Sequence, residues 1–295
     1  MESPRIGCVK YLNARPLIRG WPGAVDFDHP SALCQRLAAG ELDIALVSSF
    51  EFLRNPIYRI VDDVSISSDG PVHSVVVAHR GEMSEIKEIE LDPASESSVN
   101  LLRCLLAEIG LNPWLVSNGE FRKSAQRDVP GSAPKAFGAV AGSPPQDEFA
   151  VANLSATPNA RLLIGDQAIR FRQRHAGEFS FWDLGEQWNK LVDLPFVYAL
   201  WLIRPEVRDS ESLAERLRKL RNENLADIDK LVAEEEEFDH DFCRRYYREN
   251  LRFSFGKEEK QGLTEFHKRC LNLQLLPGGG LGFGAWDLEL ASRCV

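Results

Sequence analysis

Short apolar runs alternate with amphipathic segments along most of the 295-residue chain. Each apolar run ends at a polar corner, and in the segment that follows, apolar residues recur every three or four positions, which is typical of buried strands alternating with helices. This order predicts an α/β fold with mainly parallel sheets. We expect strands at residues 5–9, 25–27, 43–47, 74–79, 88–91, 161–166 and 195–204, and helices at 29–39, 99–109, 167–174 and 183–193.

The C-terminal third follows a different pattern. Beyond residue 204 the periodicity is helical as far as Leu276, with breaks near Asp239 and Ser254. The glutamate run at 234–237 is expected on a solvated helix face, as charge runs usually are. The glycine-rich segment that begins at Pro277 follows a helix and not a strand, so it fails the context test for a dinucleotide-binding loop. We therefore predict that residues 277–295 form a flexible extension.

One internal stretch lacks periodicity. Residues 117–159 are rich in Gly, Pro, Ser and Ala, which predicts a long, partly mobile excursion with at most one short strand.

Composition narrows the class of protein. With 44% hydrophobic and 27% charged residues, a chain of this length can bury a core large enough for two lobes. The net charge of −9 argues against nucleic acid or an anionic membrane as partner, because both need a basic surface. There is no apolar run of membrane-spanning length, and the first core strand follows Met1 closely, so a cytoplasmic protein is expected.

Familiar catalytic motifs are missing from the sequence. No histidine pair has zinc-ligand spacing, and neither a Gly-x-Ser-x-Gly elbow nor a glycine-rich phosphate loop occurs, so no metal and no cofactor are predicted. His73 lies beside Ser74 and could act as a general base. Strand alternation, however, points these two side chains to opposite faces, which disfavours that role.

Polar residues gather where the predicted strands end or helices begin. Ligands of α/β proteins bind beyond the carboxyl ends of the strands, and helix N-termini offer free N–H groups to anions. The pattern therefore predicts a cleft for a small polyanion, although each serine could instead only cap its own helix. The residues concerned are Asn13, Ser48, Ser74, Ser97, Ser98, Gly165 and Asp166.

The segments that carry these corners closely resemble the chorismate dehydratases of the futalosine route of menaquinone biosynthesis. They resemble more loosely the sister enzymes that act on cyclic dehypoxanthine futalosine. The piece Ser68-Asp-Gly-Pro-Val-His-Ser74 favours the chorismate branch. The similar segments are residues 6–17, 43–53, 68–74, 92–105, 163–166 and 183–204, together with the C-terminal helices.

The resemblance implies a periplasmic-binding-protein-like type II fold, in which two α/β lobes enclose the ligand. Lobe one would comprise residues 1–91 and 195–276, and lobe two residues 92–194. The crossovers would then lie near Leu91 and Pro195. The aperiodic 117–159 stretch is longer than the resemblance predicts.

The resemblance also implies a cofactor-free hydro-lyase that converts chorismate to 3-[(1-carboxyvinyl)oxy]benzoate. Asn13 and Ser74 would be catalytic, and Ser48, Ser97, Ser98, Gly165 and Asp166 would bind this dicarboxylate. Because Asn13 and Ser74 are neutral, the proton is expected to go to a bound water or to the substrate's own enolpyruvyl carboxylate. The alternatives are a non-catalytic binding protein for a carboxylated solute, the sister activity, or action on another cyclic dicarboxylate. The oligomeric state is not indicated.

Overall fold

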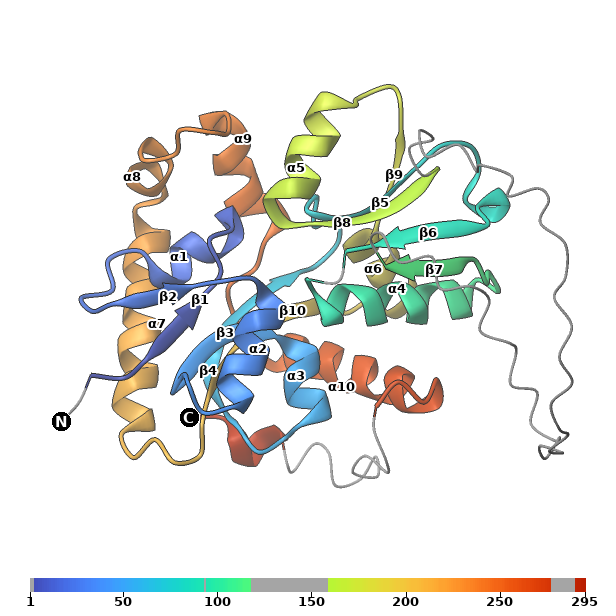
Figure 1. Ribbon diagram of the computed structural model, residues 1–295. Helices are drawn as coiled ribbons and strands as arrows, with labels where there is room; N and C mark the ends of the chain where they lie inside the picture. Colours follow the sequence, from blue (N-terminus) through green and yellow to red (C-terminus); the bar gives the residue numbers. More distant parts are fainter. Residues whose placement is uncertain (1–2, 93, 118–158, 277–289) are drawn as a thin grey trace, which may run out of the picture.

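The computed structural model describes residues 3–92, 94–117, 159–276 and 290–295. Two five-stranded sheets lie side by side, with helices packed around them (Figure 1). The first sheet contains β1 (Ile6–Cys8), β2 (Val25–Phe27), β3 (Ile44–Ser48), β4 (Arg59–Ser68) and β10 (Phe196–Ile203). The second contains β5 (Val75–His79), β6 (Glu88–Leu91), β7 (Trp114–Ser117), β8 (Ala160–Ile164) and β9 (Ser180–Asp183).

The two sheets share one topology. Their strand orders are β2-β1-β3-β10-β4 and β7-β6-β8-β5-β9. In each sheet a single strand, β10 or β5, is antiparallel to both of its neighbours, and the other pairings are parallel. The predicted α/β class with mainly parallel strand directions is therefore confirmed.

Helices cover both sheets and one joins them. Those of the first lobe are α1 (Arg15–Ile18), α2 (Pro30–Ala38), α3 (Ser49–Arg54), α7 (Ser210–Ala226), α8 (Ile228–Ala233), α9 (His240–Arg245) and α10 (Lys257–Asn272). Those of the second lobe are α4 (Glu96–Glu108), α5 (Gly165–Arg174) and α6 (Leu184–Val192). Helix α10 contacts both β10 and α4, so it lies beneath the junction (Figure 1). No helix in the described ranges is long and apolar enough to cross a bilayer.

The first crossover between the sheets lies earlier than predicted. Strands β5 and β6 both belong to the second sheet, where each of them pairs with β8. The chain therefore leaves the first sheet between Ser68 and Val75 and not near Leu91. A strand buried on both faces has the same apolar pattern in either sheet, which is why its assignment could not be predicted from that pattern. The chain returns between Val192 and Phe196, close to the predicted crossover at Pro195.

Strand β4 was not predicted, because its serines and aspartates resemble a turn. Ser65, Ser67 and Ser68 are nevertheless fully buried. The Ser65 hydroxyl donates to the carbonyl of Ser254, and the Ser67 N–H donates to the carbonyl of Arg252 at 3.0 Å. A later segment thus pairs with this edge strand and satisfies its polar groups.

Two predictions about charged and terminal segments need correction. The glutamates at 234–237 lie in the loop between α8 and α9, where Glu235 is buried and forms an ion pair with Arg15. Of the predicted flexible extension, 277–289 lies outside the described residues. Its last residues are held against β4, because Val295 exchanges backbone hydrogen bonds of 2.9 Å with Ile60 and Asp62. The predicted excursion at 117–159 also lies mostly outside the described residues.

Candidate active site

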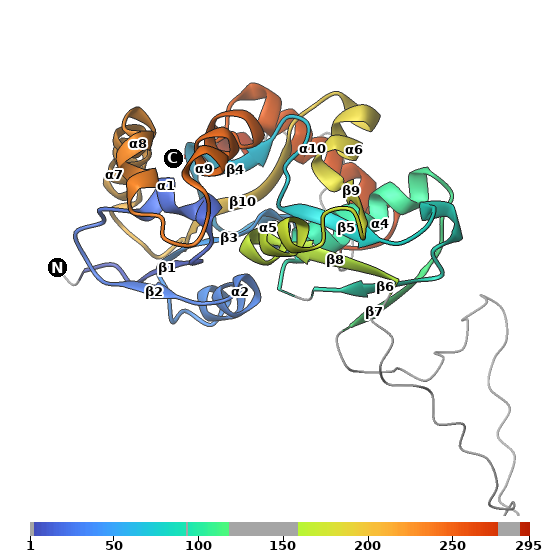
Figure 2. The ribbon, with the colours of Figure 1, turned by 90° about the horizontal axis from the view of Figure 1, so that it is seen from above.

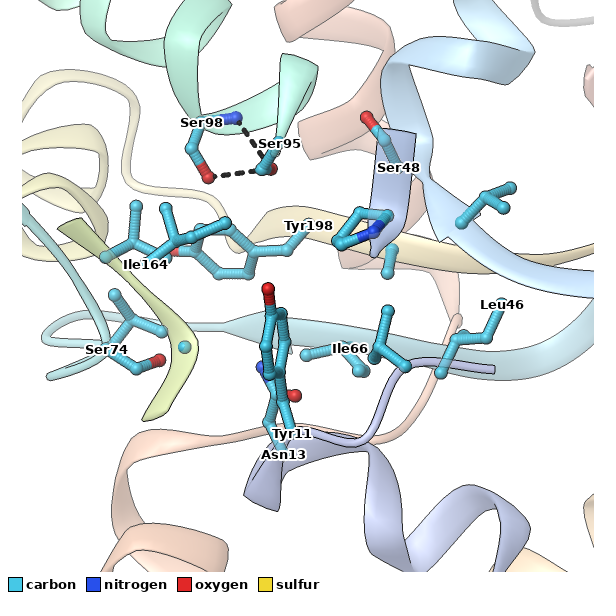
Figure 3. A pocket seen from close by; sticks show the side chains of 17 residues that line it. Tyr11, Asn13, Leu46, Ser48, Ile66, Ser74, Ser95, Ser98, Ile164 and Tyr198 are labelled. Carbon is cyan, nitrogen blue, oxygen red and sulfur yellow. Dashed lines mark hydrogen bonds between the residues drawn. The ribbon is translucent and has the colours of Figure 1, made fainter. Parts of the chain in front are cut away.

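A cavity of about 60 Å³ lies between the two sheets and is lined from both sides. Its walls are mostly apolar, and polar groups enter it from strand ends and from the start of α4 (Figure 3). Seen from above, β5 and β8 lie beside the end of β3 (Figure 2). Of the predicted site residues, the structure brings Asn13, Ser48, Ser74, Ser98 and Gly165 together on this cavity. Ser97 and Asp166 do not line it.

Asn13 lies in a 3₁₀ turn, Leu12–Ala14, in the segment that follows β1. The backbone beside it is held from two directions: the Leu12 N–H donates to Asp166 Oδ1 at 2.8 Å, and the Leu12 carbonyl accepts from the Tyr247 hydroxyl at 3.0 Å. The Asn13 Oδ1 atom is buried and has no hydrogen-bond partner among the described residues. An unpaired buried acceptor costs about 1–3 kcal/mol, so this atom is suited to accept a hydrogen bond from a ligand.

Ser74 lies just before β5 and is fully buried. Its Oγ accepts a hydrogen bond of 2.7 Å from the Tyr246 hydroxyl. Its backbone is also fixed, since its N–H donates to the Val72 carbonyl at 2.8 Å and its carbonyl accepts from the Gly165 N–H at 2.8 Å. With Tyr246 as donor, the Ser74 hydroxyl keeps its own hydrogen for a group in the cavity.

His73 does not line the cavity, in agreement with the prediction against a catalytic role. Its ring packs against Phe242 with centroids 5.3 Å apart. Burial, with Arg172 nearby, lowers the pKa of the imidazole to about 4. Its backbone adopts φ 68°, an uncommon left-handed conformation for this residue type.

The serines at the start of α4 divide into two groups. Ser95 caps the helix and accepts from the Ser98 N–H at 3.4 Å, and the two hydroxyls are 3.0 Å apart on the cavity wall (Figure 3). The Ser97 hydroxyl faces away and lies 2.6 Å from that of Ser48 and 2.9 Å from that of Ser49. Ser97 therefore joins α4 to the end of β3, and its predicted contact with substrate stays a prediction.

Two aromatic residues of the site were not predicted. Tyr11 and Tyr198 both line the cavity, and the Tyr11 hydroxyl points into it (Figure 3). Burial, together with the charges of Asp92 and Asp166, raises the pKa of Tyr11 to about 12, so its phenol is a hydrogen-bond donor at neutral pH. Tyr11 adjoins the same polar corner as Asn13, which is the only signal in the sequence that could have identified it.

Two constraints favour glycine at position 165: its left-handed backbone and the close approach of the Tyr11 ring. Gly165 has φ 56°, and a Cβ atom added there would lie 3.0 Å from the Tyr11 ring. We expect Gly165→Ala to displace the Tyr11 ring and to raise KM for the substrate about tenfold, equivalent to about 1.4 kcal/mol of binding free energy. The matched control is Gly177→Ala, because Gly177 has φ 87° and no described residue beyond its chain neighbours lies within 4 Å of the added Cβ.

Both alanine variants should lose about 1 kcal/mol of stability through left-handed strain. Steady-state kinetics and urea unfolding of the two purified variants separate the effect of backbone strain, which both share, from the effect of the Tyr11 contact, which only Gly165→Ala disturbs. Equal KM values for Gly165→Ala and Gly177→Ala would contradict the role given to the Tyr11 contact.

Asp166 is expected to make the stability depend on pH. Burial raises the pKa of its carboxyl to about 6, against an ordinary value of 3.8. The folded protein therefore binds this proton more tightly than the unfolded chain, so the penalty for the buried carboxylate is absent below about pH 4, grows from there to about pH 6, and is complete above that.

Asp166→Asn keeps an oxygen that can accept from the Leu12 N–H but removes the charge. We expect the Tm of this variant to exceed that of the parent by a margin that grows between about pH 4 and 6. Thermal unfolding of both proteins across that window measures the margin, and a constant margin would contradict the expectation.

The chain matches the menaquinone biosynthesis family over residues 4–127 and 140–272. The chain belongs to this family. As a member of the menaquinone-biosynthesis family, it is also similar to the chorismate dehydratase of Thermus thermophilus. The two are 29% identical over 293 residues, which cover 92% of this chain and 96% of that protein.

Solved structures show the same fold at low identity. Protein AF1704 from Archaeoglobus fulgidus has a TM-score of 0.64 at 15% identity and covers 92% of this chain and 98% of its own. The CA3427 product of Candida albicans, described as having the generic periplasmic-binding-protein fold, has a TM-score of 0.59 at 12% identity, with 100% and 96% covered. The aliphatic sulphonate binding protein SsuA of Escherichia coli has a TM-score of 0.59 at 11% identity, with 100% and 97% covered. The predicted periplasmic-binding-protein-like fold is confirmed.

Proposed function

We propose that this member of the menaquinone-biosynthesis family is a chorismate dehydratase that works in the cytoplasmic futalosine route. The observation that carries the proposal is that two neutral groups lie on one cavity between the lobes. They are the Ser74 hydroxyl and the Asn13 Oδ1 atom, which has no partner among the residues that the structure describes. The similarity to the Thermus thermophilus enzyme supports the choice of substrate.

The reaction requires little from the protein as an acid or base. Chorismate loses its C4 hydroxyl and the C3 proton, a C3–C4 double bond forms, and the ring becomes aromatic with release of one water. Because aromatisation supplies much of the driving force, the protein needs chiefly to hold the ring in a reactive conformation and to assist the departing hydroxyl. An apolar cavity with few polar groups is suited to that task.

Each polar group then has one role. The Ser74 hydroxyl donates to the leaving C4 oxygen, and the Asn13 oxygen accepts a hydrogen bond from the substrate and orients it. The Ser95 and Ser98 hydroxyls hold a carboxylate at the N-terminus of α4, where the positive end of the helix dipole favours an anion. The C3 proton goes to the enolpyruvyl carboxylate of the substrate or to a bound water, since none of the described side chains that line the cavity is a charged base.

No cofactor is part of this proposal. Among the described residues, no group of three or more His, Cys, Asp or Glu side chains is placed to hold a metal ion.

The test is incubation of purified protein with chorismate, followed by quantification of substrate loss and of the aromatic product. Formation of 3-[(1-carboxyvinyl)oxy]benzoate at a rate proportional to enzyme supports the proposal. Tight binding of chorismate without turnover would instead indicate a binding protein. Turnover of cyclic dehypoxanthine futalosine, or of another cyclic dicarboxylate, in place of chorismate would assign one of the alternative activities.

A further inference from the structure

The helix α9 does not end as an α-helix but continues into a π-helical turn, Tyr246–Asn250. The bond that defines it runs from the Leu251 N–H to the Tyr246 carbonyl, five residues back, at 3.2 Å. Such turns contain an extra residue and occur frequently at functional sites. Here the turn contains two consecutive tyrosines, and both are buried.

One tyrosine contacts a predicted catalytic residue, and the other contacts the chain neighbour of the second one. The Tyr246 hydroxyl donates to the Ser74 Oγ at 2.7 Å, across 172 residues of sequence. The Tyr247 hydroxyl donates to the Leu12 carbonyl at 3.0 Å, in the 3₁₀ turn that contains Asn13. Neither tyrosine lines the cavity, so each can act on the substrate only through the residue that it holds.

Further contacts fix the π-helical turn itself. The Asn250 side chain donates to the Pro71 carbonyl at 2.9 Å, within the crossover that leads to Ser74. Just beyond the turn, Arg252 and Ser67 exchange backbone hydrogen bonds of 2.8 and 3.0 Å. The Tyr246 ring also stacks on Phe242, with centroids 5.6 Å apart and planes 12° apart. Burial raises the pKa of the Tyr246 hydroxyl well above its usual range, so it remains a donor.

We infer that Tyr246 and Tyr247 are positioning residues that set the two catalytic groups from one structural element. Tyr246 occupies a lone pair of the Ser74 oxygen, which holds this oxygen in its rotamer and directs the Ser74 hydrogen to the cavity. Tyr247 fixes the backbone that aims the Asn13 side chain. The inference concerns catalysis and therefore rests on the proposed function. The effect of Tyr246 on the geometry of Ser74 is independent of that function.

The kinetic test removes one hydroxyl at a time from the full-length protein. We expect Tyr246→Phe to lower kcat on chorismate about 10- to 50-fold with KM within about threefold, because the substrate still binds but Ser74 is misdirected. In a Ser74→Ala background the same substitution should change kcat less than twofold, since no hydroxyl remains to be oriented. An equal loss of kcat in both backgrounds would show a general structural effect and overturn the inference.

Tyr247→Phe is tested in the same way against Asn13→Ala. It should lower kcat about 5- to 20-fold in the parent and less than twofold in the Asn13→Ala background. A loss of equal size in both backgrounds would overturn the role of Tyr247.

The matched control is Tyr58→Phe. Tyr58 is also fully buried, and its hydroxyl donates to Glu51 at 3.3 Å, away from the cavity. Loss of a buried phenolic hydroxyl is thus common to both variants, but only Tyr246→Phe should reduce kcat. A reduction of similar size in Tyr58→Phe would remove the specific claim for Tyr246.

Crystal structures of the parent and Tyr246→Phe give an answer that does not depend on the substrate. The Ser74 Oγ should leave its parental rotamer in Tyr246→Phe and keep it in Tyr58→Phe. An unchanged Ser74 rotamer in Tyr246→Phe would overturn the inference, even if the parent dehydrates chorismate. A parent that does not act on chorismate would refute the proposed function, and the rotamer would still decide whether Tyr246 orients Ser74.

Discussion

Replacing Ser74 or Asn13 by alanine is expected to lower kcat/KM on chorismate by about 10²- to 10⁴-fold, the range typical of a lost acid–base or charge-stabilising group. The two variants should differ in stability. Ser74→Ala leaves the buried Tyr246 hydroxyl without its acceptor, at a cost of about 1–3 kcal/mol. Asn13→Ala removes an acceptor that has no partner in the described part of the chain, so it should cost little or even stabilise the protein.

Each variant has a control elsewhere in the first lobe. Ser65 is buried and donates to the Ser254 carbonyl away from the cavity, so Ser65→Ala should lose stability and keep activity. Asn224 is buried and donates to the carbonyls of Pro16 and Arg19, so Asn224→Ala should do the same. The measurements are kcat/KM and the free energy of unfolding in urea. If Asn13→Ala and Ser74→Ala both stay within about threefold of the parent kcat/KM, the roles proposed for them are wrong.

The Asp183→Asn substitution is expected to cost about 3 kcal/mol of stability and to lower kcat/KM by about 10- to 100-fold. The Asp183 carboxylate is buried and accepts four backbone N–H groups: two cap α6, at 3.1 and 3.2 Å, and two belong to Val72 and His73, at 3.0 and 2.7 Å. Hydrogen bonds to a charged group contribute more than neutral ones, and the amide nitrogen of asparagine would face N–H groups.

The effect on activity follows from the crossover. The bonds from Val72 and His73 hold the left-handed backbone at His73, immediately before Ser74. Without them this strained turn relaxes, and a shift of about 1 Å in a catalytic group is enough for a loss of that size.

Asp239→Asn provides the comparison for Asp183→Asn. Asp239 caps α9 through a single bond from the Phe242 N–H at 2.8 Å, in an exposed position. Asparagine caps a helix about as well as aspartate, so this variant should lose less than about 0.5 kcal/mol and retain full activity. Urea unfolding and steady-state kinetics of both variants supply the numbers. Losses of equal size in the two proteins would show that Asp183 is only a helix cap.

Much of the fold could be predicted from apolar periodicity, and the exceptions have physical causes. Strand β6 was predicted with its observed bounds because it alternates acidic and apolar residues, and β10 to within one residue at each end because it is a continuous apolar run. Strand β4 was missed because its buried serines are satisfied by residues 252–254, nearly two hundred positions later in the chain. A local pattern contains no information on such a distant partner.

The same limit applies to the site. Asn13, Ser48 and Ser74 could be predicted because strand ends in an α/β protein converge, which is a property of the fold class. Ser97 was predicted to bind the substrate because serine hydroxyls at a helix start are often available to an anion. In the structure its hydroxyl contacts those of Ser48 and Ser49. Tyr246 lies in a charged helical region with no motif around it. Its contact with Ser74 became evident only in three dimensions.

The interleaved order of the strands has a consequence for synthesis on the ribosome. All strands of the second sheet lie between residues 75 and 183, so that sheet can be completed as soon as this continuous piece has emerged. The first sheet begins earlier but needs β10, which is inserted between β3 and β4. Until residue 203 has been translated, β3 and β4 both expose unpaired edges, which is the condition in which nascent chains associate wrongly. The lobe that is started first is thus finished last.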